Sequence, residues 1–410
     1  MNVPKLRFKG FSKDWENKEL GEITLWKSGG TPSKDKAAYW NGDIPWISAS
    51  TMRGIEYSDS NLKITEEGLR KGSKLAEKGS LLILVRGSML FNKIPIGIAM
   101  RDLAFNQDVK SITVDKSTTS KYVLFWFISK ENKILNLVTG TGIGAGKIDL
   151  SDLKKINLSI PKLEEQEKIA SFLTIIDQKL NLLKEKKEKL ELYKKGVMQQ
   201  IFSQKLRFKD EKGNEFPEWE DKKLGEIGEF KNGINKDKNE FGFGIPFINL
   251  MDVFGSPVVN CDNLSLINAN EKEIANYNLK KGDVLFIRSS VKKSGVGETS
   301  VVLEDMPNTV YSGFIIRFRT KQNILNLNFK KYCFWNKIFR NALVSLSSTS
   351  ANTNINQESL SELSLNIPSL AEQEKIADFL SALDTKINLV STQIEKTELW
   401  KKGLLQQMFV

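Results

Sequence analysis

Apolar residues recur every seven positions in two stretches of the chain, residues 162–202 and 369–409. A heptad repeat sustained over this length predicts a coiled-coil helix in each stretch. At ~1.5 Å per residue, each helix would be about 60 Å long. Polar residues interrupt the apolar seams in the second half of each stretch. The positions expected to form the seams are Ile169, Leu173, Ile176, Leu180, Leu183, Leu190, Ile376, Leu380, Leu383, Ile387, Val390 and Ile394.

Each predicted helix carries an apolar stripe that it cannot bury alone. The pattern therefore favours packing of the two helices against each other, over the alternative that each lies only on its own domain. The first predicted helix ends in YKKGVMQQIF (193–202), which leads into a KLRFK segment. The second ends in the matching WKKGLLQQMF (400–409), and the other KLRFK segment lies near the first residue of the sequence. We therefore expect antiparallel helices and an approximately twofold arrangement of the two copies.

The segments outside these helices combine strand and helix patterns. Short apolar runs at 81–85, 111–114, 284–287 and 314–319 predict buried strands, while aromatic-rich residues 122–133 and 329–343 predict two helices. The expected fold class is α+β: two similar mixed α/β domains joined by two long antiparallel coiled-coil helices, as a tandem duplication with pseudo-twofold symmetry.

The duplication is visible in the sequence itself. IPKLEEQEKIASFL at 160–173 returns as IPSLAEQEKIADFL at 367–380, and both KLRFK and LGEI occur twice. The interiors, 24–140 and 228–345, retain only scattered likeness. We interpret this as one scaffold carrying two diverged surfaces. The expected segments are a first domain at 1–160, a helix at 161–203, a second domain at 204–367 and a helix at 368–410.

Composition narrows the possible functions. The 410 residues include no histidine and two cysteines, with a formal net charge of +11. Without histidine, a Ser-His-Asp relay and an HExxH zinc site are both excluded. Two cysteines are too few for a four-cysteine zinc site or a disulfide framework. No apolar run approaches the ~20 residues of a membrane span, and the first residues do not resemble a signal peptide. The chain is expected to be cytoplasmic, with no metal, no cofactor and no membrane partner of its own.

The diverged interiors carry loops rich in Ser, Thr, Asn, Gly and basic residues. Such side chains suit DNA, because cations and hydroxyls bind phosphates while Arg and Asn can pair with base edges. The candidates in the first interior are Lys27, Ser28, Thr31, Ser33, Lys34, Trp40, Ser48, Ser50, Arg53, Arg86, Ser88, Thr139, Thr141 and Lys147. Those in the second are Lys231, Asn232, Asn235, Lys236, Arg288, Ser289, Ser290, Lys292, Ser348, Thr349 and Asn352. TGTGIGAGK (139–147) is not a P-loop, since Thr141 and Ile148 replace the required Gly and Ser/Thr.

Four features are informative in combination: the duplicated IPxLxEQEKIAxFL, the KKGxxQQxF endings, the KLRF…W…LGEI openings and GGTPS…YWNGDIPWIS (29–48). With these motifs, the chain resembles the specificity subunit of type I restriction–modification enzymes over nearly its whole length. The resemblance implies a non-catalytic subunit that binds double-stranded DNA. Each of its two target-recognition domains would read one half of a bipartite, asymmetric sequence. It also implies that the helices set the unspecified spacer and dock two methylation subunits, which restriction (translocase) subunits join to complete a site-specific deoxyribonuclease and adenine methyltransferase. S-adenosylmethionine, ATP and Mg²⁺ would belong to those partners, so no catalytic residue is expected in this chain.

Two other functions stay open at this point. The first is a self-sufficient Mg²⁺-dependent nuclease that uses carboxylates such as Asp43, Asp102 and Asp108, although their spacing does not form a metal-site motif. The second is a coiled-coil interaction scaffold without DNA affinity.

Overall fold

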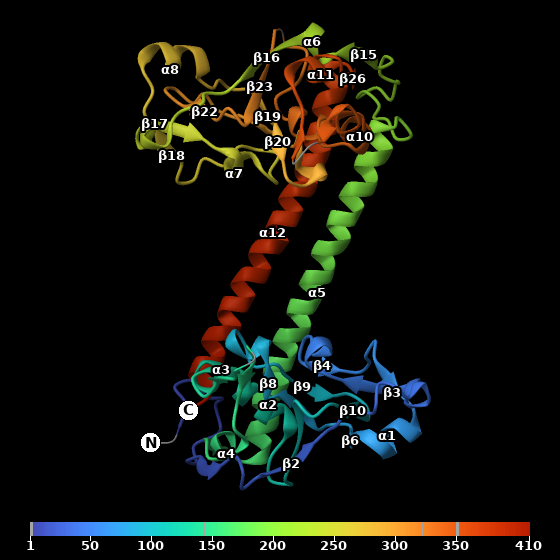
Figure 1. Cartoon of the computed structure of the whole chain (residues 1–410), viewed down its shortest axis with the longest axis vertical. Helices are drawn as coiled ribbons and strands as arrows, with labels where there is room; N and C mark the ends of the chain where they lie inside the picture. Colours follow the sequence, from blue (N-terminus) through green and yellow to red (C-terminus); the bar gives the residue numbers. More distant parts are fainter. Residues whose placement is uncertain (1–2, 143, 322, 350–351) are drawn as a thin grey trace. The chain divides into compact units, whose positions relative to one another are not determined.

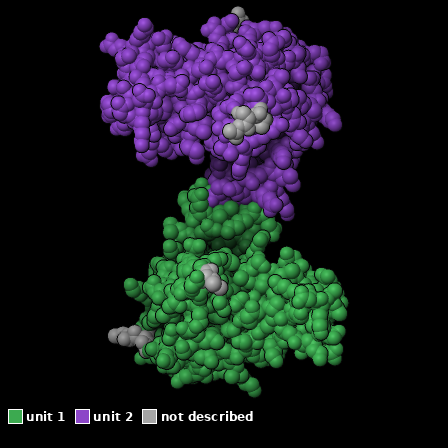
Figure 2. Space-filling model, viewed as in Figure 1, with its two compact units in different colours: residues 1–185, 392–410 green, residues 186–391 purple. Residues whose placement is uncertain are grey.

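The computed structural model describes residues 3–142, 144–321, 323–349 and 352–410. The chain divides into two compact units (Figure 2): unit 1 contains residues 1–185 and 392–410, and unit 2 contains residues 186–391. Within the described residues, no helix is long and apolar enough to cross a membrane.

Two long helices, α5 (Leu163–Phe202) and α12 (Leu370–Met408), each contribute to both units. In unit 1 the first part of α5 lies beside the last part of α12, where the Phe172 and Trp400 rings are 6.0 Å apart and Lys184 Nζ lies 2.7 Å from Glu398. In unit 2 the pairing is reversed, because Lys194 near the end of α5 forms an ion pair with Asp384 near the start of α12. The helices are therefore antiparallel, as predicted, and their bounds agree with the prediction to within two residues.

The apolar seams are buried by two kinds of neighbour. In unit 1, Ile169, Leu173, Ile176 and Leu180 of α5 join one core with the strands of that unit and with residues near the end of α12. In unit 2, Ile376, Leu380 and Leu383 do the same with the end of α5. Leu183, Leu190, Ile387 and Ile394 are only partly buried, while Val390 is buried. Each helix thus packs on its own domain at its start and beside the other helix at its end, so both of the alternatives drawn from the sequence apply.

The polar residues that interrupt the seams form a repeated ion pair. Lys401 pairs with Asp177 in unit 1, and its ammonium lies 5.6 Å from the centre of the Phe125 ring. In unit 2, Lys194 pairs with Asp384 and lies 5.3 Å from the centre of the Tyr332 ring. The lysine stems pack along the apolar seam while their charges are matched.

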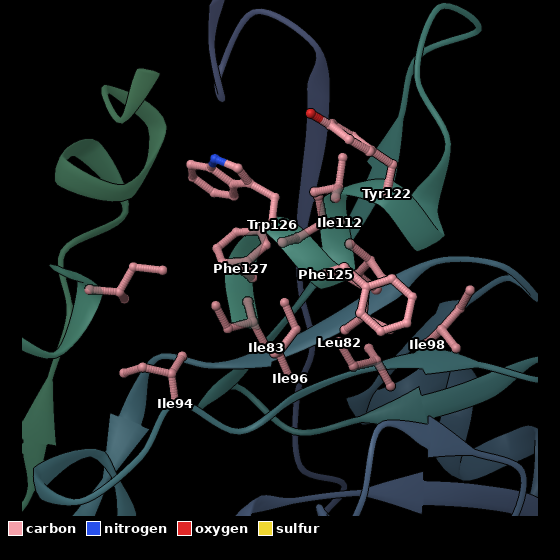
Figure 3. Packing of buried hydrophobic residues seen from close by; sticks show 14 of the residues in the cluster. Leu82, Ile83, Ile94, Ile96, Ile98, Ile112, Tyr122, Phe125, Trp126 and Phe127 are labelled. Atoms are coloured by element: carbon pink, nitrogen blue, oxygen red, sulfur yellow. The ribbon is translucent and has the colours of Figure 1, made fainter. Parts of the chain in front are cut away.

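The core of unit 1 is a five-stranded sheet of order β2-β11-β7-β9-β4. The bounds of its strands are Thr24–Ser28 (β2), Val109–Val114 (β11), Leu81–Leu84 (β7), Ile96–Ala99 (β9) and Glu56–Tyr57 (β4). Helix α2 (Ser120–Ser129) covers one face of this sheet, and Figure 3 shows its aromatic side chains above Leu82, Ile83 and Ile96. Burial of this apolar surface stabilises the unit by ~25 cal/mol per Å².

Three smaller sheets complete the strands described in unit 1. Their orders are β5-β3-β10-β6, β12-β13-β8 and β1-β14. The bounds are Lys63–Ile64 (β5), Trp40–Ile47 (β3), Leu103–Phe105 (β10), Lys74–Ala76 (β6), Thr139–Gly140 (β12), Gly146–Lys147 (β13), Arg86–Gly87 (β8), Glu16–Glu19 (β1) and Asn157–Ile160 (β14). The short helices are α1 (Glu66–Gly72), α3 (Glu131–Leu135) and α4 (Leu150–Lys154). Strands β1 and β14 pair just before the start of α5, the long helix labelled in Figure 1.

Unit 2 repeats most of this topology with different side chains, but its two larger sheets each have one strand fewer, without strand counterparts of β4 and β6 among the described residues. Its sheets have the orders β16-β23-β19-β21, β18-β17-β22, β20-β25-β24 and β15-β26. The bounds are Gly228–Asn232 (β16), Ile315–Thr320 (β23), Val284–Ile287 (β19), Thr299–Val301 (β21), Ser265–Ile267 (β18), Phe241–Ile248 (β17), Val310–Tyr311 (β22), Ser289–Ser290 (β20), Thr353–Asn354 (β25), Ser348–Thr349 (β24), Glu220–Lys223 (β15) and Ser364–Ile367 (β26). The short helices are α6 (Leu224–Ile227), α7 (Leu250–Val253), α8 (Glu271–Tyr277) and α11 (Gln357–Ser361). The four strands predicted from apolar runs correspond to β7, β11, β19 and β23, which confirms those predictions.

The prediction of one continuous helix in each aromatic-rich segment was wrong, because each segment forms two short helices. The first is α2 followed by α3, with a break at Lys130, where Glu131 turns to accept a hydrogen bond from the Ile94 N–H. The second is α9 (Lys330–Cys333) followed by α10 (Lys337–Leu346). Asn336 causes this second break, because its backbone is extended and its side chain accepts a hydrogen bond from Phe339 N, which makes it the N-cap of a new helix.

The duplicated segment at 160–173 and 367–380 has the same structural role in both units. Gln166 donates to the carbonyls of Pro161 and Ser117 and accepts from Thr119 N. Gln373 donates to Pro368 and Ile324 and accepts from Asn326 N. Each glutamine thereby fixes the start of a long helix to the loop before the aromatic helix of its domain.

The glutamate before each glutamine binds the arginine of KLRFK. Arg7 Nε lies 2.7 Å from Glu165, and Arg207 Nη2 lies 2.9 Å from Glu372. The backbone repeats as well, because Leu6 N donates to Gln407 O and Leu206 N donates to Gln200 O. The end of α12 therefore receives the first KLRFK as the end of α5 receives the second, which is the re-entry expected from the sequence.

Candidate nucleic-acid interface

The small sheet of unit 1 brings together candidates that are far apart in the sequence. In β12-β13-β8, Lys147 lies opposite both Arg86 and Thr139, and Ser88 follows β8 directly. The side chains of Arg86, Ser88, Thr139 and Lys147 are exposed. Lys147 also lies 2.6 Å from Asp149, which offsets part of its charge. A cluster of two cations and two hydroxyls on a short twisted sheet can contact phosphates and base edges.

A second group of candidates in unit 1 lines a groove of about 650 Å³. The lining includes Thr31, Lys34, Trp40, Ser48 and Ser50, together with Trp46, Leu62, Asn106, Gln107 and Asp108. Trp40 and Trp46 form one wall in a T-shaped pair with ring centres 5.3 Å apart. The Ser48 and Ser50 hydroxyl oxygens are 3.0 Å apart. The groove is adjacent to the small sheet, since Val85 N, just before β8, donates to Asp108 O.

The loop 106–108 is the polar part of this groove that the DNA-binding prediction missed. The side-chain oxygen of buried Asn106 accepts from the N–H groups of Asp108 and Val109, which braces the loop. Gln107 is exposed at its tip, and Thr31 Oγ1 donates to Gln107 Oε1 at 2.6 Å. Three polar residues directly after the buried strand at 103–105 were the available signal in the sequence.

The remaining candidates of unit 1 do not line the groove. Lys27 and Ser28 are exposed on β2, where Lys27 lies 3.7 Å from Glu77. Ser33 and Arg53 are exposed, and the Ser33 carbonyl accepts from Trp40 Nε1. Thr141 is partly buried, and its hydroxyl donates to the carbonyl of Ala145.

The small sheet of unit 2 collects a different set of side chains on the same topology. In β20-β25-β24, Ser289 and Ser348 lie opposite Asn354, while Ser290 and Thr349 lie opposite Thr353. Asn352 directly precedes β25 and is exposed. Arg288 precedes β20, and its carbonyl accepts from Ile355 N. Lys292 is exposed two residues after β20.

The candidates near β16 are engaged within unit 2. Lys236 lies 2.9 Å from Glu273, and this contact contributes, after the hydrogen bond from the Asn270 backbone, to lowering the pKa of Glu273. The Lys231 ammonium lies 5.0 Å from the centre of the Tyr277 ring. Asn232 is partly buried in β16, and Asn235 is exposed. The charges of Lys231 and Lys236 therefore already interact with side chains of unit 2.

The three carboxylates considered for a nuclease do not converge. Asp43 is exposed on β3, Asp102 accepts from Lys78 N, and Asp108 accepts from the Asn106 amide. Across the described residues, no group of three or more Cys, Asp or Glu side chains is close enough to hold a metal ion. Beside the groove, burial lowers the pKa of Lys110, and Asp108 partly offsets this effect. The Lys110 ammonium donates to the Gln107 carbonyl.

Comparison with known proteins identifies the family. The family model for the type I restriction modification DNA specificity domain matches the chain twice, over residues 12–192 and 217–399. The chain belongs to this family and carries two copies of the domain.

Three curated relatives support the assignment. The chain is 24% identical to the type I restriction enzyme MjaVIII specificity subunit of Methanocaldococcus jannaschii over 402 residues, which are 96% of this chain and 91% of that protein. It is 29% identical to the MjaIX specificity subunit of the same organism, over 69% of this chain and 68% of that protein. Identity rises to 35% with the EcoR124I/EcoR124II specificity subunit of Escherichia coli, but this match spans only 44% of this chain and 45% of that protein.

Solved structures share the fold. The S subunit of a type I restriction–modification system from M. genitalium matches with a TM-score of 0.57 at 16% identity, covering 100% of this chain and 99% of that chain. A chain from a structural study of the assembly and conformational transition of the type I restriction–modification system matches with a TM-score of 0.61 at 15% identity, over 97% and 98% of the two chains.

Proposed function

We propose that this chain is the DNA-reading subunit of a type I restriction–modification complex, in which the recognition part of each unit contacts one half of a bipartite, asymmetric sequence. The observation that carries the proposal is the repeated small sheet with diverged side chains. On one topology, unit 1 presents Arg86, Thr139 and Lys147, whereas unit 2 presents Ser289, Ser290 and Ser348. One scaffold with two sets of polar side chains is what two different half-sites require.

The chemistry of the complex belongs to its partners in this proposal. Methyl transfer from S-adenosylmethionine to adenine would be performed by methylation subunits. ATP-driven translocation and Mg²⁺-dependent cleavage would be performed by restriction subunits. The subunit itself then needs no catalytic residue, and its contribution is to position the partners on one DNA sequence. One of the similar structures comes from a study of such complex assembly.

The long helices offer a repeated apolar surface for two copies of one partner. Leu182 and Leu389 occupy equivalent positions in the two copies and are 65% and 60% exposed. Leu192 and Leu399, 68% and 72% exposed, form a second equivalent pair. An aromatic residue follows each of these, Tyr193 in α5 and Trp400 in α12. Exposed large apolar side chains at matched positions are typical of a protein interface, and we propose that the methylation subunits dock there.

Replacing the repeated leucines should weaken this docking. We expect the Leu182→Gln, Leu389→Gln double variant to bind the methylation subunit about tenfold or more weakly, because an apolar contact worth at least ~1.4 kcal/mol is lost. Titration of the purified proteins by calorimetry measures the effect. The matched control is Glu188→Gln with Glu395→Gln, which changes two exposed polar positions that are also equivalent in the two copies. Equal affinity of both double variants and the unaltered chain would place the docking surface elsewhere.

DNA binding by the chain with its methylation partner tests the proposal directly. We expect the affinity for target DNA to fall steeply with salt, since contacts to phosphates release counterions. An affinity that does not change between low and moderate salt would favour the scaffold alternative. Cleavage of DNA by this chain alone in the presence of Mg²⁺ would favour the nuclease alternative. Fluorescence anisotropy and gel analysis of the products distinguish these outcomes.

A further inference from the structure

The tip of the loop between β10 and β11 in unit 1 has a counterpart at the same place in unit 2. Three backbone hydrogen bonds fix the first tip: Asn106 N to Ile47 O, Gly30 N to Phe105 O, and Val85 N to Asp108 O. The corresponding bonds in unit 2 are Ser312 N to Ile248 O, Ile234 N to Tyr311 O, and Arg288 N to Phe314 O. Gln107 therefore corresponds to Gly313, and Thr31, one residue after Gly30, corresponds to Asn235.

The side chains at these two equivalent positions differ completely. In unit 1 the Thr31 hydroxyl donates to Gln107 Oε1 at 2.6 Å. In unit 2 a side chain at Gly313 would have its Cβ only 1.9 Å from Asn235 Oδ1, so Asn235 fills the space that a longer residue would need. Phe314, which follows, exposes 60% of its surface, whereas its counterpart Asp108 is partly buried. The backbone of the tip is shared, and its chemistry is specific to each unit.

We propose that Gln107 is a base-reading residue of the first half-site, that it recognises an A·T pair, and that Thr31 is its positioning residue. The inference rests on the proposed function and deepens it. A glutamine amide can accept from adenine N6 and donate to adenine N7 at the same time. With Thr31 donating to one lone pair, Gln107 Oε1 keeps a second lone pair. Within the described part of the chain, its Nε2 has no hydrogen-bond partner.

The surroundings hold this amide ready for a base edge. Asn106 braces the loop through two N–H groups, and the Lys110 ammonium donates to the Gln107 carbonyl at 2.7 Å. Fixing the backbone and the amide before binding reduces the entropy that recognition would otherwise cost. The same groove carries the exposed cation Lys34, which is suited to hold the DNA backbone beside the amide.

The test uses the complex of this chain with its methylation subunit and a panel of duplexes, each with one base pair of the methylated target replaced. We expect Gln107→Ala to reduce discrimination ten- to hundredfold at one A·T pair of the first half and to leave every other position unchanged. Thr31→Val should lower discrimination at the same pair by a smaller factor, and Thr31→Ser should restore it. Lys34→Gln is the contrast, because loss of a phosphate contact should weaken all duplexes equally and reduce the salt slope by about 1.

Three results would overturn the inference: uniform weakening by Gln107→Ala, unchanged discrimination, or an effect in the second half. Each of these leaves the proposed function intact, since the unaltered complex would still prefer its target. A complex that shows no sequence preference before any substitution would instead contradict the proposed function. Circular dichroism of each variant confirms that the comparison is made between folded proteins.

Discussion

Exchange of residues 16–160 for the matching segment of a relative with a different target should change one half of the recognised sequence and leave the other half unaltered. The exchanged segment begins in β1 and ends in β14, whose paired residues Glu16 and Ile160 are neighbours, so the junctions lie side by side. Arg7, Glu165 and α5 stay native, which preserves the link between KLRFK and the long helix. A single mismatched base pair costs ~1–3 kcal/mol, so a wholly different half-site should lower affinity for the old target at least a thousandfold.

The measurement is a map of methylated adenines in cells that carry the chimera with the methylation subunit. The reciprocal exchange of residues 220–367, from β15 to β26, is the matched control and should change the opposite half. A change in both halves from a single exchange would show that the two units do not read DNA independently.

Arg207→Met should destabilise unit 2 by about 3–5 kcal/mol, because it leaves a buried carboxylate without its cation. The Glu372 side chain is 0% exposed and lies 2.9 Å from Arg207 Nη2. Trp219 Nε1 also donates a hydrogen bond to the Glu372 carboxylate, at 3.0 Å. Urea unfolding followed by fluorescence should show an earlier transition for the variant.

Two further variants show whether the effect comes from the unpaired charge. Arg207→Met with Glu372→Gln should recover part of the loss, since the buried group is then neutral. Lys223→Met removes the exposed partner of Glu362 and should leave the unfolding midpoint nearly unchanged, because surface ion pairs contribute little. If Arg207→Met also left the midpoint unchanged, the repeated Arg–Glu pair would not have the structural role assigned to it.

The fold was predictable wherever a periodic pattern decided it. The heptads gave both long helices and their pairing, and short apolar runs gave the central strands β7, β11, β19 and β23. The breaks in the aromatic helices were not predictable, since they depend on Asn336 acting as an N-cap and on Glu131 bonding to the distant Ile94. Residues such as Leu183 and Leu190 continue the heptad in sequence but are only partly buried.

The sequence indicated which loops belong to the candidate interface, but it did not indicate which of their residues lie side by side. Composition indicated Arg86 and Lys147, yet only pairing of β8 with β13 places them opposite each other. Conversely, Lys236 lies in a basic loop of the kind that contacts DNA, but in the structure it forms an ion pair with Glu273. Gln107 was missed because three polar residues after a strand are a weak signal on their own, and its proposed role depends on Thr31, which lies far away in the sequence.

The most direct test of the central claim is a genome-wide map of N6-methyladenine in cells that carry this chain with its methylation partner, compared with cells that lack only this chain. We expect one bipartite, asymmetric motif to be methylated in the first cells and to lose its methylation in the second. Methylation that persists without the chain, or a motif formed by one uninterrupted run of bases, would contradict the account.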